Sequence, residues 1–205
     1  MKTVRLLLAI TLVIFVVGNV IVAQGPPAGG GGGGGQGRGG GGGRGGGGGI
    51  PAPLVITAPY EDGGMIPAKY GGNMGVSPAL TWTGAPMTTQ SFALIFHDLD
   101  VGLRGGTEDV LHWMIWDIPA TATGLPEGVK PGDQPDGSRQ GRGITGQPAY
   151  FGPAPPAPTT HHYTIELYAL SAKLNLPAET TRAQLLAAME GKVVAKGAYN
   201  GRFKQ

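Results

Sequence analysis

Two apolar segments, separated by a short Gly-rich connection, constrain the fold of this chain most strongly. The first runs from Ser91 to Asp100 and the second from Leu111 to Pro119, with three glycines in the residues between them. Both segments are short, rich in β-branched and aromatic residues, and bounded by turn formers. They are therefore predicted to form two buried β-strands, which we expect to lie side by side in one sheet.

Polar residues lie at the ends of these two segments. Asp98 and Asp100 close the first strand, and His112 lies at the start of the second. Residues two apart in an extended chain point the same way, so the two carboxylates are expected to share one face. If the strands are neighbours, the carboxylates and the imidazole meet at one rim of the sheet. This rim is the candidate site.

The N-terminus has the order of a secretory signal peptide. Lys2 and Arg5 precede an apolar run from Leu6 to Val17, and small residues follow, so we predict a signal peptide over residues 1–23. The protein is then secreted or periplasmic. An uncleaved membrane anchor is the alternative, because the apolar stretch continues with interruptions to Val22. Membrane contact is expected only through such an anchor.

Residues 24–49 are predicted to be a disordered Gly-rich linker, and residues 50–205 a single domain. The linker is almost entirely Gly, with Arg38 and Arg44 as its only charges, and offers no apolar surface to bury. Four of the 15 basic residues precede residue 50, so the domain has 11 basic against 13 acidic residues. This balance excludes a basic nucleic-acid-binding domain.

The remaining pattern is that of a mainly β domain. Short strands are predicted at Leu54–Thr57 and Tyr163–Leu170, and Val193–Phe203 is predicted to be a last strand or an extended tail. The long segment from Ala120 to Thr160 is dominated by turn formers and is expected to be functional. We predict an antiparallel β-sandwich with a C-terminal helix packed at its edge.

One helix is predicted, near the C-terminus. Thr181 and Gln184 have the spacing of a capping box, and Gly191 stands where a C-terminal cap belongs. Between them lies an apolar stripe, formed by Leu185, Leu186 and Met189.

Six sequence blocks follow one another along the chain: Ser77–Trp82, Asp98–Asp100, His112–Trp113, Ile118–Pro126, Tyr150–Pro156 and His161–Tyr163. In this order they resemble the phosphatidylethanolamine-binding protein family, and most closely its bacterial and archaeal Raf kinase inhibitor-like subgroup (YbhB/YbcL type). The resemblance covers roughly residues 54 to 203.

The resemblance implies a Greek-key antiparallel β-sandwich with a small anion pocket at one end, which takes phosphate or a phosphoethanolamine head group. It implies a binding protein rather than an enzyme, without a cofactor or a metal. The positions that match pocket positions of the family are Asp98, Asp100, His112, Tyr150, Pro155, His161 and Tyr163.

The chain departs from the family pattern at two loops. Leu99, Val101 and Gly102 replace residues of the usual Asp-Pro-Asp-Ala-Pro motif, so this loop is expected to be less rigid. Gly143 and Ile144 stand where the subgroup often has Asn and Asp, which removes an acidic side chain expected near the pocket mouth.

The chemistry of the predicted rim suits a phosphate. His112 and His161 can donate hydrogen bonds to it, and neighbouring carboxylates favour the protonated imidazoles. Neighbouring residues in a strand face opposite ways, so His162 is expected to point away from His161, and His97 away from Asp98.

Two other functions remain open from the sequence. A protein-interaction module could inhibit a kinase or a protease through its surface loops, as some members of the family do. Two histidines with an aspartate could also bind zinc and activate water, which would make the protein a hydrolase. A covalent nucleophile is not indicated, since the chain has no Cys and no Gly-x-Ser-x-Gly elbow.

Overall fold

The computed structural model describes residues 53–72 and 75–205. For Arg104, it describes the backbone but not the side chain. The predicted signal peptide and linker lie outside these residues. Within the described part of the chain, no helix is long and apolar enough to cross a membrane.

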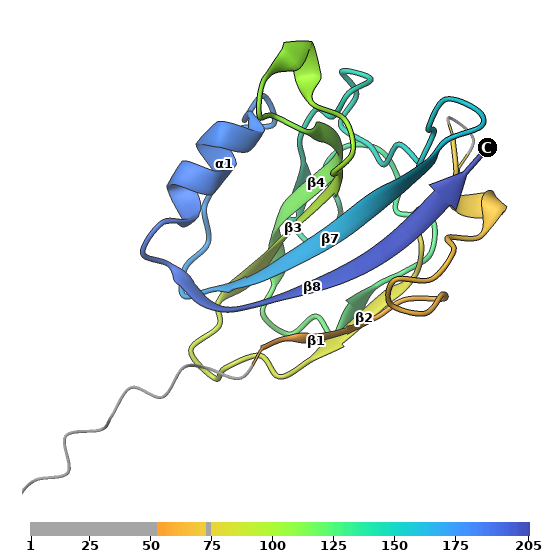
Figure 1. The fold of residues 1–205 in the computed structure, drawn as a ribbon. Helices are drawn as coiled ribbons and strands as arrows, with labels where there is room; N and C mark the ends of the chain where they lie inside the picture. The colour runs from red at the N-terminus through yellow and green to blue at the C-terminus, as the bar shows by residue number, and fades with distance from the viewer. Residues whose placement is uncertain (1–52, 73–74) are drawn as a thin grey trace, which may run out of the picture. The chain divides into compact units, whose positions relative to one another are not determined.

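Two antiparallel sheets form the domain (Figure 1). The smaller sheet has the order β1-β2-β5 and the larger has the order β6-β4-β3-β7-β8. The strands are β1 (Val55–Thr57), β2 (Leu80–Thr83), β3 (Ser91–Asp98), β4 (Val110–Pro119), β5 (Gly124–Leu125), β6 (Arg139–Gln140), β7 (Thr160–Leu170) and β8 (Val193–Lys204). The predicted β-sandwich is confirmed, and the two central apolar segments are neighbours, as expected.

The main core lies between the two sheets. Alternate residues of β3, namely Phe92, Leu94 and Phe96, face the smaller sheet and pack with its Leu80 and Trp82. This alternation follows from the pleat of the strand, which sends successive side chains to opposite faces. Every residue of β3 is buried because both faces of the larger sheet are covered.

A second, smaller core lies on the other face of the larger sheet. There, helix α1 (Arg182–Met189) packs Leu185 and Met189 against Ile95, Met114 and Trp116. The predicted capping box is present, since Thr181 and Gln184 satisfy each other's backbone N–H groups, and Gly191 follows the helix with φ +72°. The helix covers a sheet face and not the edge of the sandwich, which corrects the prediction (Figure 1).

The segment between β4 and β7 is not wholly irregular. Its residues add β5 to the smaller sheet and β6 to the edge of the larger one. Two single-turn 3₁₀ helices, η1 (Ala68–Tyr70) and η2 (Leu103–Gly105), lie in other connections. These elements of two or three residues have no periodicity of their own, so the sequence did not predict them.

Candidate functional site

A β-bulge in β4 brings His112 into the main core. Phe96 of β3 pairs with Trp113, but the next residue, His97, pairs with Leu111, so His112 is an extra residue in its strand. A bulge lets two consecutive side chains face the same side. His112 and Trp113 therefore both point toward the smaller sheet, where the His112 ring contacts the rings of Phe96 and Tyr163.

Asp98 and His161 form a buried pair at the end of β3. The Asp98 carboxylate is 2.8 Å from Nδ1 of His161, and it also accepts the backbone N–H of Asp100 at 2.9 Å. Asp98 is 3% exposed. Since Nδ1–H donates to the carboxylate, Nε2 of His161 is left for another partner and makes no hydrogen bond to the described residues.

Asp100 does not share the face of Asp98. β3 ends at Asp98, and Asp100 lies in the turn that follows, where it accepts the backbone N–H of His162 at 2.7 Å and pairs with that ring at 2.9 Å. Burial alone would raise the pKa of Asp100, but these hydrogen bonds lower it below its ordinary value. The expectation of a shared face was wrong because it assumed extended chain beyond the end of the strand.

His112 is held in one tautomer by the backbone. Its Nδ1–H donates to the carbonyl oxygen of Phe151 at 3.0 Å, and the Phe151 ring stacks on it at 5.4 Å. Burial lowers the pKa of His112, although Asp98 and the Phe151 carbonyl act in the opposite direction. The expectation that the carboxylates promote its protonation is thus wrong, because burial outweighs them. A neutral His112 presents Nε2 as a hydrogen-bond acceptor.

Tyr163 lies between the two imidazoles. Its ring is 5.2 Å from that of His112 and 6.5 Å from that of His161, and it pairs with Asp98 across the β3–β7 ladder. The side chain is 1% exposed, and its hydroxyl has no hydrogen-bond partner in the described residues. Burial raises the pKa of Tyr163, with Asp98 adding to the effect, so the hydroxyl keeps its proton. The Asp98 carboxylate and the backbone of Ala154 lie close to this hydroxyl, but neither has hydrogen-bond geometry with it.

Two loops, one at Gly72 and one at Gly152, form a wall beside Tyr163 and the two imidazoles. The backbone N–H of Gly152 donates to the carbonyl oxygen of Gly72, and the N–H of Gly72 donates to the carbonyl oxygen of Pro153. A Cβ on Gly152 would lie 2.2 Å from the carbonyl oxygen of Tyr70, so only glycine permits this approach.

The other two predicted pocket residues belong to this wall. The Tyr150 ring stacks on Phe96 at 5.7 Å, and its hydroxyl donates to the Tyr70 carbonyl, so Tyr150 supports the wall and uses its O–H proton within it. Pro155 is buried in the same loop. Sequence reasoning overlooked Phe151, whose carbonyl orients His112; no sequence signal marks a backbone acceptor.

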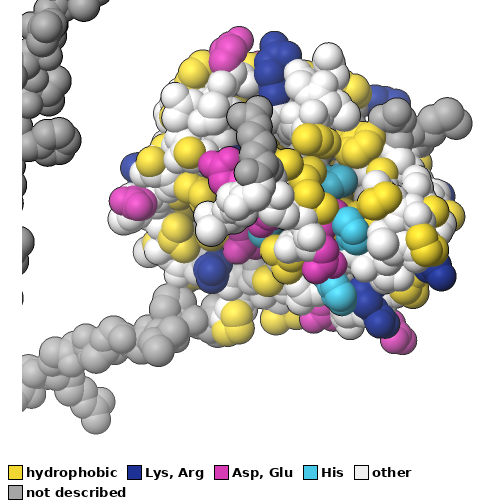
Figure 2. Space-filling view, turned by 45° about the horizontal axis from the view of Figure 1, so that its top comes forward, with side chains coloured by type: hydrophobic (Ala, Val, Ile, Leu, Met, Phe, Trp, Pro, Cys, Tyr) yellow, Lys and Arg dark blue, Asp and Glu magenta, His cyan; other side chains and the backbone are white. Residues whose placement is uncertain are grey.

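The polar groups reach one face of the molecule. Figure 2 shows histidine side chains together on this face, next to acidic side chains and bordered by hydrophobic ones. Of the two imidazoles beside Tyr163, that of His161 is the more open, with 12% of its side chain exposed, whereas His112 is 3% exposed. No group of three or more His, Cys, Asp or Glu side chains with the arrangement of a metal site occurs among the described residues.

The fold and the six sequence blocks agree with a comparison to known protein families. A sequence model of the phosphatidylethanolamine-binding protein family matches residues 57–204. The chain belongs to this family. Within the phosphatidylethanolamine-binding protein family, it is similar to a UPF0098 protein of Methanothermobacter thermautotrophicus, with 39% identity over 153 residues, which is 73% of this chain and 97% of that protein. It is also 39% identical to the UPF0098 protein YbcL of Escherichia coli over 107 residues, 50% of this chain and 56% of YbcL.

Solved structures of family members have the same fold. The crystal structure of Escherichia coli YbcL matches with a TM-score of 0.65 and 26% identity, covering 75% of this chain and 99% of YbcL. A phosphatidylethanolamine-binding protein homologue from Chlamydia trachomatis matches with a TM-score of 0.66 and 28% identity, covering 75% of this chain and 98% of its own. Family and fold, as inferred from the sequence, are thereby confirmed.

Proposed function

We propose that this protein is a non-enzymatic binding protein whose rim at His112, His161 and Tyr163 captures a small phosphate-bearing ligand, either phosphate or a phospholipid-type head group. The observation that carries the proposal is the unpartnered hydroxyl of Tyr163, buried between two imidazoles. A buried hydroxyl without a partner costs about 1–3 kcal/mol, and a ligand oxygen at this place would remove that cost.

The arrangement offers a phosphate both donors and an acceptor. A protonated His161 donates from Nε2 while Asp98 holds its Nδ1–H, and the Tyr163 hydroxyl donates beside it. A neutral His112 accepts, which suits the P–OH of monoprotonated phosphate or the ammonium of phosphoethanolamine. A ligand with both kinds of group therefore fits this rim better than a simple anion does.

Titration calorimetry with phosphate and with phosphoethanolamine, from about pH 5.5 to 8.5, tests the proposal. Affinity is expected to fall as pH rises through the neutral range, because the charge-assisted hydrogen bond needs a protonated imidazole. His161→Ala should weaken binding about tenfold to a hundredfold, the loss of one hydrogen bond to a charged group of roughly 1.5–3 kcal/mol. His162→Ala is the matched control, since that ring is exposed and paired with Asp100.

Comparison of the two ligands separates the candidate sources. Tighter binding of phosphoethanolamine indicates a lipid head group, and equal binding indicates recognition of the phosphate alone. Equal losses from His161→Ala and His162→Ala, or an affinity that is flat with pH, would place the ligand elsewhere.

Export is the second part of the proposal. The charged, apolar and small-residue order of residues 1–23 supports secretion and a mature chain that begins near Gln24. The intact mass of the protein from its native host decides the point. A mass that includes residues 1–23 would contradict cleavage and favour the uncleaved anchor.

A further inference from the structure

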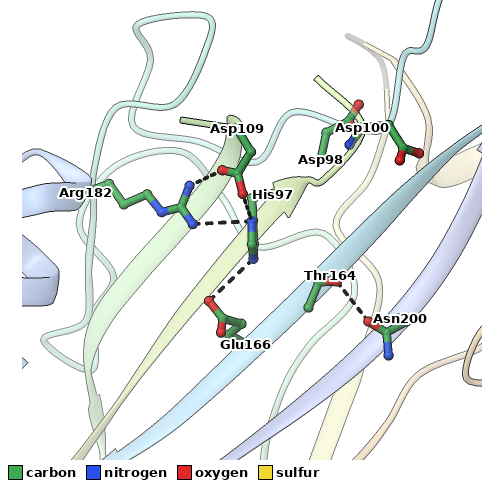
Figure 3. Close-up of polar contacts among 8 residues, drawn as sticks. All are labelled: His97, Asp98, Asp100, Asp109, Thr164, Glu166, Arg182 and Asn200. Carbon is green, nitrogen blue, oxygen red and sulfur yellow. Dashed lines mark hydrogen bonds and ion pairs between the residues drawn. The ribbon is translucent and has the colours of Figure 1, made fainter. Parts of the chain in front are cut away.

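A second polar cluster lies on the opposite face of the larger sheet, beneath helix α1. Its members come from four elements and are His97 of β3, Asp109 just before β4, Glu166 of β7 and Arg182 of α1 (Figure 3). Nδ1 of His97 is 2.6 Å from the Asp109 carboxylate, and Nε2 is 3.4 Å from that of Glu166. Arg182 donates to the other oxygen of Asp109.

This geometry favours a doubly protonated His97. Each ring nitrogen faces a carboxylate, and although Nε2 and Glu166 do not have hydrogen-bond geometry, a proton on each nitrogen makes both contacts attractive. Nη2 of Arg182 is 3.3 Å from Nδ1 of His97, but the shorter contact to Asp109 assigns the Nδ1 proton to that carboxylate. With His97 as an imidazolium, two cations and two carboxylates balance.

The cluster joins the 99–109 loop and helix α1 to the larger sheet. The hydrogen bond between His97 and Asp109 closes the base of the loop formed by residues 99–109, and Arg182 is the first residue of α1. The helix has only two buried residues, Leu185 and Met189. Asp109 and Arg182 also line a cavity of about 480 Å³ between the loop and the helix.

We propose that His97, as an imidazolium, is a pH-dependent clasp that holds the first turn of α1 and the 99–109 loop on the larger sheet. When the ring loses a proton, its single remaining N–H stays on Asp109, the closer carboxylate. Nε2 then turns a lone pair toward Glu166, and the four groups are left with a net charge of −1. The lone pair repels the carboxylate of Glu166, whose side chain is 25% exposed, so the clasp opens at its sheet side.

The direction of the pH effect follows from the groups that face His97. Burial and Arg182 lower the pKa of His97, but the neighbouring carboxylates of Glu166 and Asp109 outweigh them and raise it above the ordinary value. The nearby His97 ring lowers the pKa of Glu166 against the effect of burial, with help from Tyr168 and Lys196. Burial would raise the pKa of Asp109, but Arg182 and His97 lower it.

The clasp therefore has a definite working range. A raised histidine pKa contributes stability that is complete below the unfolded value of about 6.5 and is lost as pH rises through the folded value. The pKa values of the two carboxyls are lowered, so their contributions are lost only as pH falls below the ordinary carboxyl range and through those lowered values. The clasp is complete in mildly acidic solution and weakens from neutral pH upward.

Amide hydrogen exchange of the ligand-free protein at about pH 6 and pH 8.5, corrected for intrinsic rates, tests the clasp. Protection of α1 and of the 99–109 loop should fall about tenfold or more at the higher pH, the loss of one hydrogen bond to a charged group. Protection in β1 and β2 should stay the same. In His97→Gln, α1 should be equally weakly protected at both pH values, whereas in His162→Gln the protection of α1 should change with pH as it does in the wild type.

Glu166→Gln provides a second variant if His97→Gln does not fold. A glutamine amide can donate to the lone pair of a neutral His97, so the pH dependence of α1 protection should shrink. Wild-type protection of α1 that does not change with pH, or an unchanged pH dependence in His97→Gln, would overturn the proposal. Because no ligand is present, the outcome is independent of the proposed phosphate binding.

Discussion

Replacing Asp98 with asparagine removes a negative charge from the candidate site without changing its size. In the structure, Asp98 accepts hydrogen bonds from Nδ1 of His161 and from the backbone N–H of Asp100, and it is 3% exposed. The oxygen of an asparagine can keep one of these two hydrogen bonds, but its NH₂ group cannot accept the proton of the imidazole. Asp98→Asn therefore loses one of these two buried hydrogen bonds to a charged carboxylate.

The expected loss of stability follows from this hydrogen bond. A hydrogen bond to a charged group contributes roughly 1.5–3 kcal/mol. For a domain of about 150 residues, each kcal/mol lowers Tm by about 2–4 °C, so Asp98→Asn should lower it by roughly 3–12 °C. The free energy of unfolding, measured with urea, should fall by the same 1.5–3 kcal/mol or so with an unchanged slope.

Asp100→Asn is the matched control, because Asp100 forms the same kind of pair with His162 at the surface. Exposed ion pairs contribute about 0–1 kcal/mol, and an asparagine can still accept the backbone N–H of His162. The two variants should thus differ by about 0.5–3 kcal/mol, which urea unfolding can measure. Equal losses would refute the conclusion that burial makes the Asp98–His161 pair the stronger one.

Two further predictions concern the other groups of the rim. Tyr163→Phe removes a buried hydroxyl that has no partner, so urea unfolding should show unchanged or higher stability. Calorimetry should show weaker phosphate binding by the same variant. A lower stability would mean that the hydroxyl is hydrogen-bonded in the free protein. Nitrogen-detected NMR should find His112 as the neutral Nδ1–H tautomer at about pH 6.5, because burial lowers its pKa. The contribution of neutral His112 to stability is then present above about pH 6.5 and is lost as pH falls through the lowered pKa of this residue. A titration of His112 at or above the ordinary histidine pKa would contradict this.

Local sequence patterns were sufficient for much of the fold. Strand-like composition located β3 and β4, and the spacing of Thr181 and Gln184 located the start of α1. The order of six motif blocks identified the family, which the match over residues 57–204 confirms. Each of these signals depends on near neighbours in the chain, or on the order of residues along it, and both are visible without coordinates.

The faces to which the polar side chains point were decided by the tertiary structure. Strict alternation gave the right face for His97 but not for Asp100, because β3 ends at Asp98 and the next residues turn. The bulge at His112 likewise shifts the pleat of β4 by one residue. Strand ends and bulges depend on which residues pair across the sheet, and a change of one residue reverses the face.

The cluster around His97 shows the same limit. The sequence suggested only that this ring points away from Asp98; its partners are 12, 69 and 85 residues further along the chain, at Asp109, Glu166 and Arg182. The His112 tautomer is set by a carbonyl of a distant loop, and its pKa by burial. Charges and hydrogen bonds act through space, and a buried group's ionisation depends on everything packed around it. The residue types at the site could be predicted from the sequence, but only the tertiary structure determined their partners, faces and protonation.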